Sequence, residues 1–450
     1  MTVSVVIAAV TVFAMAASVI FKPFIKIKKF NLGLYWVICL VGAAIMVCTG
    51  QISFSQISEG LFAPSAVNPL KILALFLSMT LISVYLGDSG FFAYVADKIF
   101  VKHSRGGLKL FLALYLVVSV LTVFTSNDII ILTFTPPVIM FCKKAGISPI
   151  PYLFGEFVAA NSWSMALIVG NPTNIYLAGS FSVTFSEYFS VMWFAAILGG
   201  ATSLLMLLVV FRKSLFCKNQ INRAESRHLS MQGGFYGTSS NAPSCVKTNK
   251  FLMICDMIHL GLCIVFLAIS DLIGVEMWLI CVILFGSLTI FTSVYSLIKE
   301  KSLRRTGRVL CAAPYELIPF IISMFIIVLA LARNGFSEML FTALCTETKN
   351  DAFIFGFLSA GAANVFNNIP MSVLFEKIIA GKSAAAVYGT IIGSNLGAFI
   401  TPVGALAGIM WNKLLAANDV KFSFRQFILY GTIIALPSLA AACGALYLTI

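Results

Sequence analysis

The chain has few charged residues. Asp, Glu, Lys and Arg together make up 10% of its 450 residues, whereas a soluble domain carries about 25%. Hydrophobic residues make up 60%, a share that no soluble core could bury. The long uncharged runs instead match the roughly 20 apolar residues that a helix needs to cross a bilayer. We therefore expect a multi-pass integral membrane protein of a plasma or inner membrane, with the lipid bilayer as its main partner.

Motifs of the common enzymes are also missing. The sequence has no HExxH, no GxxxxGK[ST] and no GxGxxG, so neither zinc hydrolysis nor ATP-driven pumping by this chain is supported. The 11 cysteines form no CxxC pair and the 3 histidines have no metal-ligand spacing. We expect no enzyme activity, no metal, and no cofactor beyond a coupling proton or sodium ion.

Basic residues outnumber acidic ones, 30 against 17. They cluster in short segments between apolar runs, as cytoplasmic loops do. Aromatic residues do not alternate with them as they would in a nucleic-acid site. The excess of positive charge therefore indicates membrane topology, and no nucleic-acid partner is expected.

Apolar runs fill most of the chain. Four weaker runs, at about 106–142, 151–182, 351–376 and 384–412, are each interrupted by a polar, Gly- or Pro-bearing cluster. Such an interruption is tolerated at membrane depth only where protein or a water-filled cavity surrounds it. Eight stronger runs can cross as single helices; they lie near 2–21, 31–49, 69–87, 189–211, 251–270, 277–297, 313–332 and 426–449.

The two halves of the chain repeat one pattern. Ser78-Met79 precedes Gly90-Phe91, and Ser323-Met324 precedes Gly335-Phe336 at the same spacing. In each half an Asn-bearing break follows, and a second break comes after it. Paired broken segments at corresponding positions are the best sequence indicator of a transporter's binding site.

Charge counting decides how the broken segments sit. If 106–142 and 351–382 are re-entrant hairpins, 25 of the 30 Lys and Arg residues lie on the cytoplasmic side, against 12 if the first segment crosses once. The positive-inside rule selects the hairpins, which then enter from opposite sides. The sequence predicts an all-α integral membrane protein of two inverted-topology repeats, each with a re-entrant helical hairpin and a broken transmembrane helix, with about 10 full spans plus 2 hairpins.

A polar segment joins the two halves. It is rich in Gly, Ser and Asn, so it is predicted to be a flexible cytoplasmic linker. Its basic residues favour a topogenic role, and a regulatory or lipid-binding patch is the alternative. The predicted divisions are N-terminal spans (1–60), a first transport repeat (61–211), the linker (212–250), spans that lead the second half (251–310) and a second transport repeat (311–450).

Short polar side chains at the breaks are the candidate ligands for substrate or ion. Hard cations prefer oxygen ligands, and opened helices present N–H groups to anions and carbonyls to cations. The candidates are Thr125, Ser126, Asn127, Asp128, Asn171, Thr173 and Asn174 in the first half, and Asn364, Asn367, Asn368, Ser394, Asn395, Thr401 and Gly404 in the second.

Asp128 and Glu156 are the candidates for proton coupling. A carboxylate at mid-membrane costs about 2.5–3.5 kcal/mol, so Asp128 should be protonated, paired or facing a cavity. Its alternative role is to cap the second hairpin arm at Ile129. For Glu156 the alternative is a structural pairing with Lys143 or Lys144 near the interface.

These stretches resemble the ion transporter superfamily that includes arsenite efflux permeases, citrate-type carriers and sodium–proton antiporters. The resemblance runs from about residue 65 to the end. It rests on 125–128 with Thr135-Pro136, on 170–174, and on 401–407 with Trp411. The arsenite permease branch is the most similar, since it shares the Asn-Asp tip and the Thr-Pro-x-Gly run. The resemblance implies two hairpins, a site between the halves, proton coupling and a homodimer.

We therefore predict a secondary active transporter that moves a small inorganic or organic anion or oxyacid, coupled to protons or sodium. The resemblance favours arsenite or antimonite efflux. A sodium–proton antiporter or a citrate or dicarboxylate carrier is the alternative. Dicarboxylate carriers of the superfamily have Ser-Asn-Thr at both tips, whereas Ser-Asn-Asp (126–128) and Phe-Asn-Asn (366–368) stand here. An ion channel is the alternative of another class, but inverted repeats with broken helices favour a moving carrier.

Overall fold

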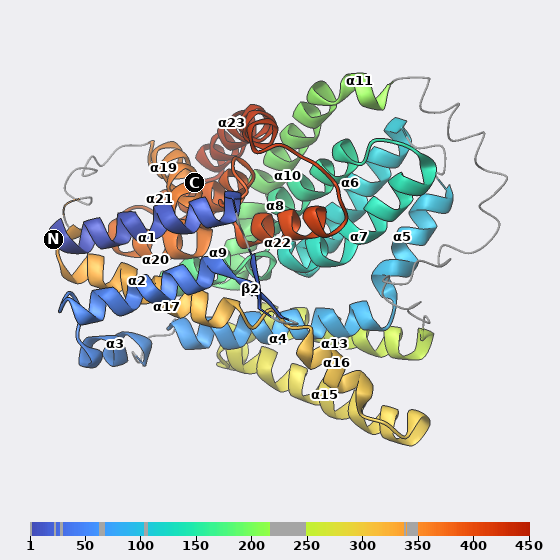
Figure 1. The fold of residues 1–450 in the computed structure, drawn as a ribbon, viewed down its shortest axis with the longest axis horizontal. Coiled ribbons are helices and arrows are strands. Elements are labelled where there is room, and N and C mark those ends of the chain that lie inside the picture. Colours follow the sequence, from blue (N-terminus) through green and yellow to red (C-terminus); the bar gives the residue numbers. More distant parts are fainter. Residues whose placement is uncertain are drawn as a thin grey trace.

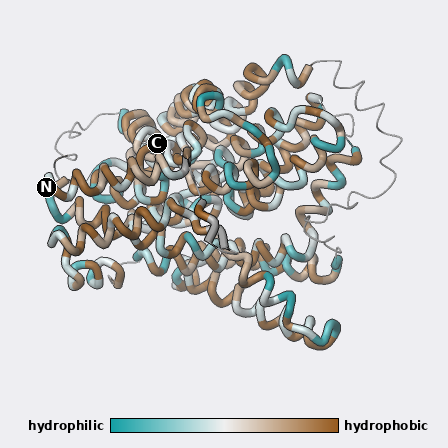
Figure 2. Tube along the Cα trace, viewed as in Figure 1, coloured by the Kyte–Doolittle hydropathy of each residue, from teal (hydrophilic) through white to brown (hydrophobic). Residues whose placement is uncertain are grey.

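The computed structural model describes residues 2–21, 24–27, 30–62, 68–102, 107–216, 249–336, 339 and 350–450. Most of the predicted linker lies outside them. The described chain is a bundle of helices that are hydrophobic over most of their length (Figures 1 and 2). The six that are long and apolar enough to cross a membrane are α4 (Pro69–Asp88), α6 (Gly107–Phe124), α10 (Phe185–Val210), α13 (Lys250–Ala268), α15 (Met277–Glu300) and α23 (Phe424–Thr449).

Two helical hairpins stand where the sequence predicts them. The first consists of α6 and α7 (Asn127–Ala145), which meet at Thr125 and Ser126. The second consists of α19 (Asp351–Phe366) and α20 (Asn368–Ile379), which meet at Asn367. The predicted fold class is confirmed.

Both predicted broken helices are also present. The first runs through α8 (Ile150–Trp163) and α9 (Pro172–Ser180), with the short 3-10 turns η1 (Ser164–Ala166) and η2 (Ile168–Gly170) between them. The second runs through α21 (Ala384–Leu396), η4 (Gly397–Phe399) and α22 (Leu406–Ala417). Each break therefore opens the helix over several residues instead of bending it.

The remaining long helices exchange partners between the two halves. In the second half, α17 (Leu317–Arg333) packs on α1 (Thr2–Phe21) and α2 (Leu34–Cys48) of the first half. In return, α4 packs on α13 and α15 of the second half. Figure 1 shows α1, α2 and α17 along the left side of the molecule, and α4, α13 and α15 along its lower side. Each half therefore holds the other in place.

Shorter elements lie between the long helices, and the sequence did not predict them. One is an antiparallel pair of strands, β1 (Phe24–Ile27) and β2 (Phe30–Gly33), in which Ile27 is opposite Phe30. The others are α3 (Phe54–Leu61), α5 (Phe91–Lys102), α11 (Arg212–Leu215), α14 (Ser270–Ile273) and α16 (Arg304–Cys311).

The repeat seen in the sequence has a structural counterpart at the ends of α4 and α17. Gly90 has φ of 92° and Gly335 has φ of 81°. These left-handed angles favour glycine, which has no Cβ to clash with the backbone. The two helices therefore end in the same kind of turn, at the position where the sequence repeats Gly-Phe.

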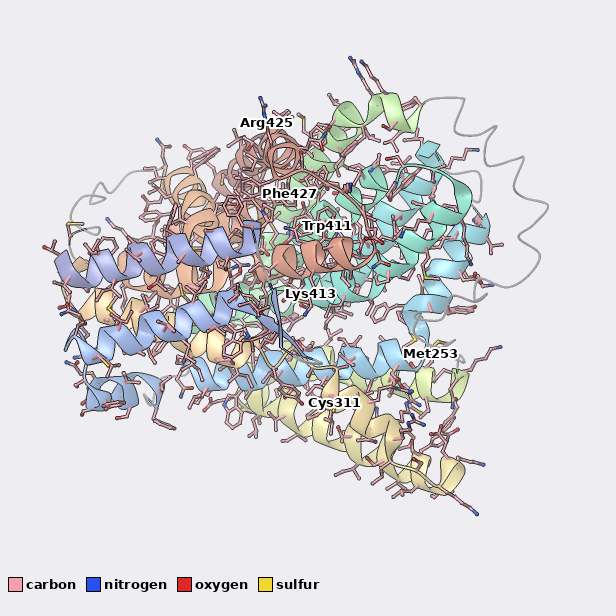
Figure 3. The ribbon with its side chains drawn as sticks, in the orientation of Figure 1. Met253, Cys311, Trp411, Lys413, Arg425 and Phe427 are labelled. Carbon is pink, nitrogen blue, oxygen red and sulfur yellow. The ribbon has the colours of Figure 1, made fainter. Side chains whose placement is uncertain are left out.

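Aromatic side chains fix α22 between α8 and α23. The Trp411 ring lies 5.2 Å from that of Phe157 and 5.8 Å from that of Phe427, between ring centroids. Figure 3 labels Trp411 and Phe427 where α22 and α23 meet. Such pairs add about 0.5–1.5 kcal/mol each beyond burial, so the second half-helix of the break is held firmly in position.

Contacts between helix ends agree with the topology inferred from charge. Lys143 Nζ lies 2.6 Å from the carbonyl of Asn418, and both were assigned to the cytoplasmic side. On the other side Arg333 Nη2 lies 3.4 Å from Glu59 Oε2. Lys71 pairs there with Glu276. Each pair joins segments that the charge count places on the same face of the membrane.

Candidate functional site

The two breaks meet at a junction of buried amides and hydroxyls. Asn171 Nδ2 donates to Asn395 Oδ1 at 2.8 Å, and Asn395 Nδ2 donates to Asn174 Oδ1 at 2.7 Å. The hydroxyls of Thr173 and Ser394 lie 3.0 Å apart. All five side chains are buried. Residues that are more than 200 positions apart in the sequence are thus in direct contact.

The first break is shaped by Asn171 and Pro172. Pro172 begins α9, where its missing N–H costs nothing. Asn171 is the N-cap, and its Oδ1 accepts from the Thr173 N–H at 3.2 Å. Asn174 Nδ2 donates to the carbonyls of Ser164 and Leu167, two backbone acceptors of the opened segment.

The tip of the first hairpin reaches the end of α8. Asn127 Nδ2 donates to Asn161 Oδ1 at 3.1 Å. Asn127 Oδ1 accepts from the Asp128 N–H at 2.9 Å. Ser126 is the N-cap of α7 but makes no side-chain cap bond, and the Thr125 hydroxyl donates back to the carbonyl of Leu121. Of the four predicted tip residues, Asn127 is the one whose side chain connects the hairpin to the broken helix.

Asp128 lies in the first turn of α7 and is 4% exposed. The capping role considered for it is wrong, because Asn127 and not Asp128 accepts the N–H bond at this helix start. Within the described part of the chain, its carboxylate has no hydrogen bond and no ion pair. The carboxyl group therefore has only the positive end of the α7 dipole to favour its charged form.

The second hairpin tip is held more tightly to its own break. Asn367 has φ of 75°, and its Nδ2 donates to the carbonyl of Val403 at 2.9 Å. The Asn368 N–H donates to the carbonyl of Gly404 at 3.0 Å. Among the described side chains, Asn368 Oδ1 is buried without a hydrogen-bond partner. This amide oxygen is a free acceptor at the position equivalent to Asp128.

Asn364 and Thr401 form the rest of this contact. Asn364 Oδ1 accepts from both the N–H and the hydroxyl of Thr401, at 2.8 and 2.7 Å. A Cβ at Gly404 would lie 2.7 Å from the same Oδ1. The glycine is therefore required by close packing.

Glu156 lies in the middle of α8 and is fully buried. Its Oε1 accepts from the Thr135 hydroxyl of α7 at 2.9 Å. Its Oε2 is buried without a hydrogen-bond partner in the described chain. The structural pairing considered with Lys143 or Lys144 is wrong, because within the described chain Glu156 bonds to Thr135 and has no ion-pair partner.

Sequence reasoning missed two members of the junction. Asn161 accepts the bond from the hairpin tip, and the Ser164 hydroxyl lies 2.7 Å from Asn395 Oδ1. Both are fully buried. The sequence feature that indicates them is the run of polar residues at 161–164, which lies inside an apolar segment just before the break. The sequence interpretation placed the break at the Asn-Pro-Thr-Asn cluster of 171–174 and did not include the polar residues before it.

The junction is a mostly neutral site. Its amides and hydroxyls can both donate and accept hydrogen bonds, and none of the fourteen predicted residues is basic. Asp128 is the one ionisable group among the fourteen. Such a set can hold a small hydroxylated or partly charged solute and exchange a proton beside it.

Comparison with known proteins gives one family and several relatives. The family described as citrate transporter matches residues 34–389. The arsenical pump membrane protein of Escherichia coli (strain K12) is 27% identical over 432 residues, which cover 93% of this chain and 94% of that protein. A putative arsenical pump membrane protein of Bacillus subtilis (strain 168) is 23% identical over 411 residues, covering 88% and 90%.

Two solved structures share the fold. The YdaH transporter of Alcanivorax borkumensis superposes with a TM-score of 0.52 at 12% identity, over 99% of this chain and 97% of that one. MtrF of Neisseria gonorrhoeae superposes with a TM-score of 0.50 at 14% identity, over 98% and 94%. At these identities the likeness concerns the fold alone.

Proposed function

Because this chain belongs to the citrate transporter family, and is a membrane transporter of that type, we propose that it carries a small oxyacid across the membrane in exchange for protons. Arsenite and antimonite are the proposed substrates and efflux is the proposed direction. The single observation that carries the proposal is the junction of Asn171 and Asn395, to which Asn161 and Ser164 link the hairpin tip that contains Asp128.

The chemistry of the junction favours a neutral oxyacid over a citrate. Arsenous acid is largely uncharged at neutral pH and offers three hydroxyl groups. Amide and hydroxyl side chains match such groups by donating and accepting hydrogen bonds. A multiply charged carboxylate is usually held by Arg or Lys, and the fourteen candidate residues include neither. The arsenical pump relatives from two bacteria support the same substrate class.

Asp128 is the proposed coupling group, with Glu156 as a second one. Both are buried carboxyl groups with few partners, and such groups inside a membrane mark ion or proton routes. At the equivalent position of the second half Asn368 cannot ionise. One ionisable tip therefore fits the movement of one proton per cycle.

Transport in proteoliposomes tests the proposal. Purified protein would be reconstituted with an acidic lumen, and uptake of arsenite, citrate and sodium would be compared with protein-free liposomes. We expect arsenite uptake that depends on the proton gradient and stops with a protonophore. Uptake of citrate without arsenite would favour the citrate carrier, and sodium uptake alone would favour the sodium–proton antiporter.

Light-scattering mass analysis of the same purified protein tests the proposed homodimer.

A further inference from the structure

Three sulfur atoms meet inside the scaffold, one from each of α4, α13 and α15. Cys263 Sγ lies 3.4 Å from Met79 Sδ and 3.7 Å from Cys281 Sγ. Both cysteines are fully buried and Met79 is 4% exposed. None of the three belongs to the junction of the two breaks. We call this group the sulfur cluster.

A cavity opens directly outward of the sulfur cluster. It has a volume of about 380 Å³, and its lining includes Leu75, Met277 and the charged pair of Lys71 and Glu276. Residues four positions apart share one face of a helix. Leu75 is four residues from Met79 and Met277 is four from Cys281, so the sulfur cluster lies one helical turn below the cavity floor. The charge count places this end of the helices on the outer side of the membrane.

From this geometry we propose that Met79, Cys263 and Cys281 bind a soft monovalent metal ion of the copper(I) and silver(I) class, which enters through the cavity. Thiolate and thioether sulfur select such ions. Zinc takes four ligands in structural sites, whereas this cluster supplies three. The number and the kind of donors both favour a monovalent soft ion.

Charge balance also favours a monovalent ion. One thiol releases its proton to water through the cavity as the metal–sulfur bond forms, because metal binding needs the thiolate. The second thiol and the thioether donate lone pairs without losing a proton. One thiolate neutralises one positive charge, so the complex carries no net charge. A net charge would be costly among apolar helices.

Metal binding would tie α4 to α13 and α15. These three helices form one of the two scaffold groups in which the halves exchange partners. Since a ligand that binds only the folded state stabilises it, silver(I) or copper(I) should raise the thermal transition of the full-length protein in detergent. The proposal does not depend on which substrate the junction carries.

Copper(I) binding to the reduced full chain tests the proposal. The metal would be titrated in competition with a chromogenic copper(I) chelator. We expect the wild type to bind one more tight equivalent than Cys263→Ser/Cys281→Ser. The matched control Cys142→Ser/Cys443→Ser removes two buried cysteines on other helices and should keep that equivalent. Equal tight binding by the wild type and the Cys263→Ser/Cys281→Ser variant would overturn the site.

Two further measurements stand even if the double variant fails to fold. Met79→Leu preserves an apolar side chain of similar size and should weaken copper(I) affinity by about tenfold or more, since even outer-shell changes act on that scale. X-ray absorption of the copper-loaded protein should give a shell of sulfur alone. An oxygen or nitrogen shell, or unchanged affinity in Met79→Leu, would each contradict the proposal.

Discussion

Asn171 and Asn395 are 224 positions apart, yet the side-chain nitrogen of the first lies 2.8 Å from the side-chain oxygen of the second. Each stands at a break in a helix, and the two helices belong to opposite halves of the chain. Because Asn395 also donates to Asn174, one amide closes the contact between the halves. The site is therefore a product of both repeats.

Asn395→Ala should destabilise the protein and stop transport. The change leaves Asn171 Nδ2 without its acceptor and Asn174 Oδ1 without its donor, and each buried unsatisfied group costs about 1–3 kcal/mol. Thermal unfolding in detergent would measure the loss. Asn418→Ala, at the less buried end of α22, removes a bond to the carbonyl of Leu414 and should have a much smaller effect. Equal effects would mean that the junction has no special role.

Gly404→Ala should impair transport while the protein still folds. The new methyl group would meet Asn364 Oδ1 at 2.7 Å and the carbonyl of Ala398 at 3.0 Å, and such overpacking costs about 1–3 kcal/mol. Gly361→Ala is the matched control, because its Cβ would meet nothing within 4 Å. The measurement is the initial rate of uptake at matched protein amounts. A normal rate in Gly404→Ala would show that the close contact does not matter.

Arg305→Ala should destabilise the scaffold far more than Arg308→Ala. Asp88 forms ion pairs with both arginines, each with a nitrogen 2.8 Å from a carboxylate oxygen, but Arg305 is 6% exposed in its side chain and Arg308 is 63% exposed. Arg305 also lies 4.0 Å from the buried carboxylate of Asp256. Breaking a buried pair costs about 3–5 kcal/mol, whereas an exposed pair contributes about 0–1 kcal/mol. Chemical unfolding would compare the two, and a larger loss in Arg308→Ala would contradict the burial argument.

The sequence could predict the hairpins and breaks because each has a local cause. Pro172 and Pro402 remove backbone donors, and the charge count gave the side on which each hairpin enters. The partners of Asn127 and Glu156 could not be predicted in this way. Asn127 bonds to Asn161 and Glu156 to Thr135 only because of how α7 is rotated against α8, which no local pattern encodes. The strand pair at 24–33 was not predicted, because the lysines of this segment indicated a cytoplasmic loop.

Two native cysteines should report the topology of the membrane. Cys48 and Cys311 are both exposed, at the ends of α2 and α16, and Figure 3 labels Cys311. With the other cysteines replaced, a membrane-impermeant maleimide should reach Cys48 from outside and Cys311 only from the cytoplasm, because the positive-inside count orients the chain that way. Cys48→Ser and Cys311→Ser, in the same background, measure the labelling that does not come from these two cysteines. Labelling of both from one side would contradict the inverted repeats.

The proposed coupling role of Asp128 predicts that Asp128→Asn uncouples transport without unfolding the protein. The carboxylate has no hydrogen bond to lose within the described chain, so Asn should fit in its place. What disappears is the exchangeable proton. Glu300→Gln, which alters an exposed carboxylate at the end of α15, is the matched control and should behave as the wild type.

The most direct measurement is arsenite transport by Asp128→Asn in two modes, in the same proteoliposomes. Uptake driven by an imposed proton gradient should be lost. Exchange of labelled for unlabelled arsenite at equal pH, which needs no net proton movement, should continue. Gradient-driven accumulation at the wild-type level in Asp128→Asn would contradict the coupling role of Asp128.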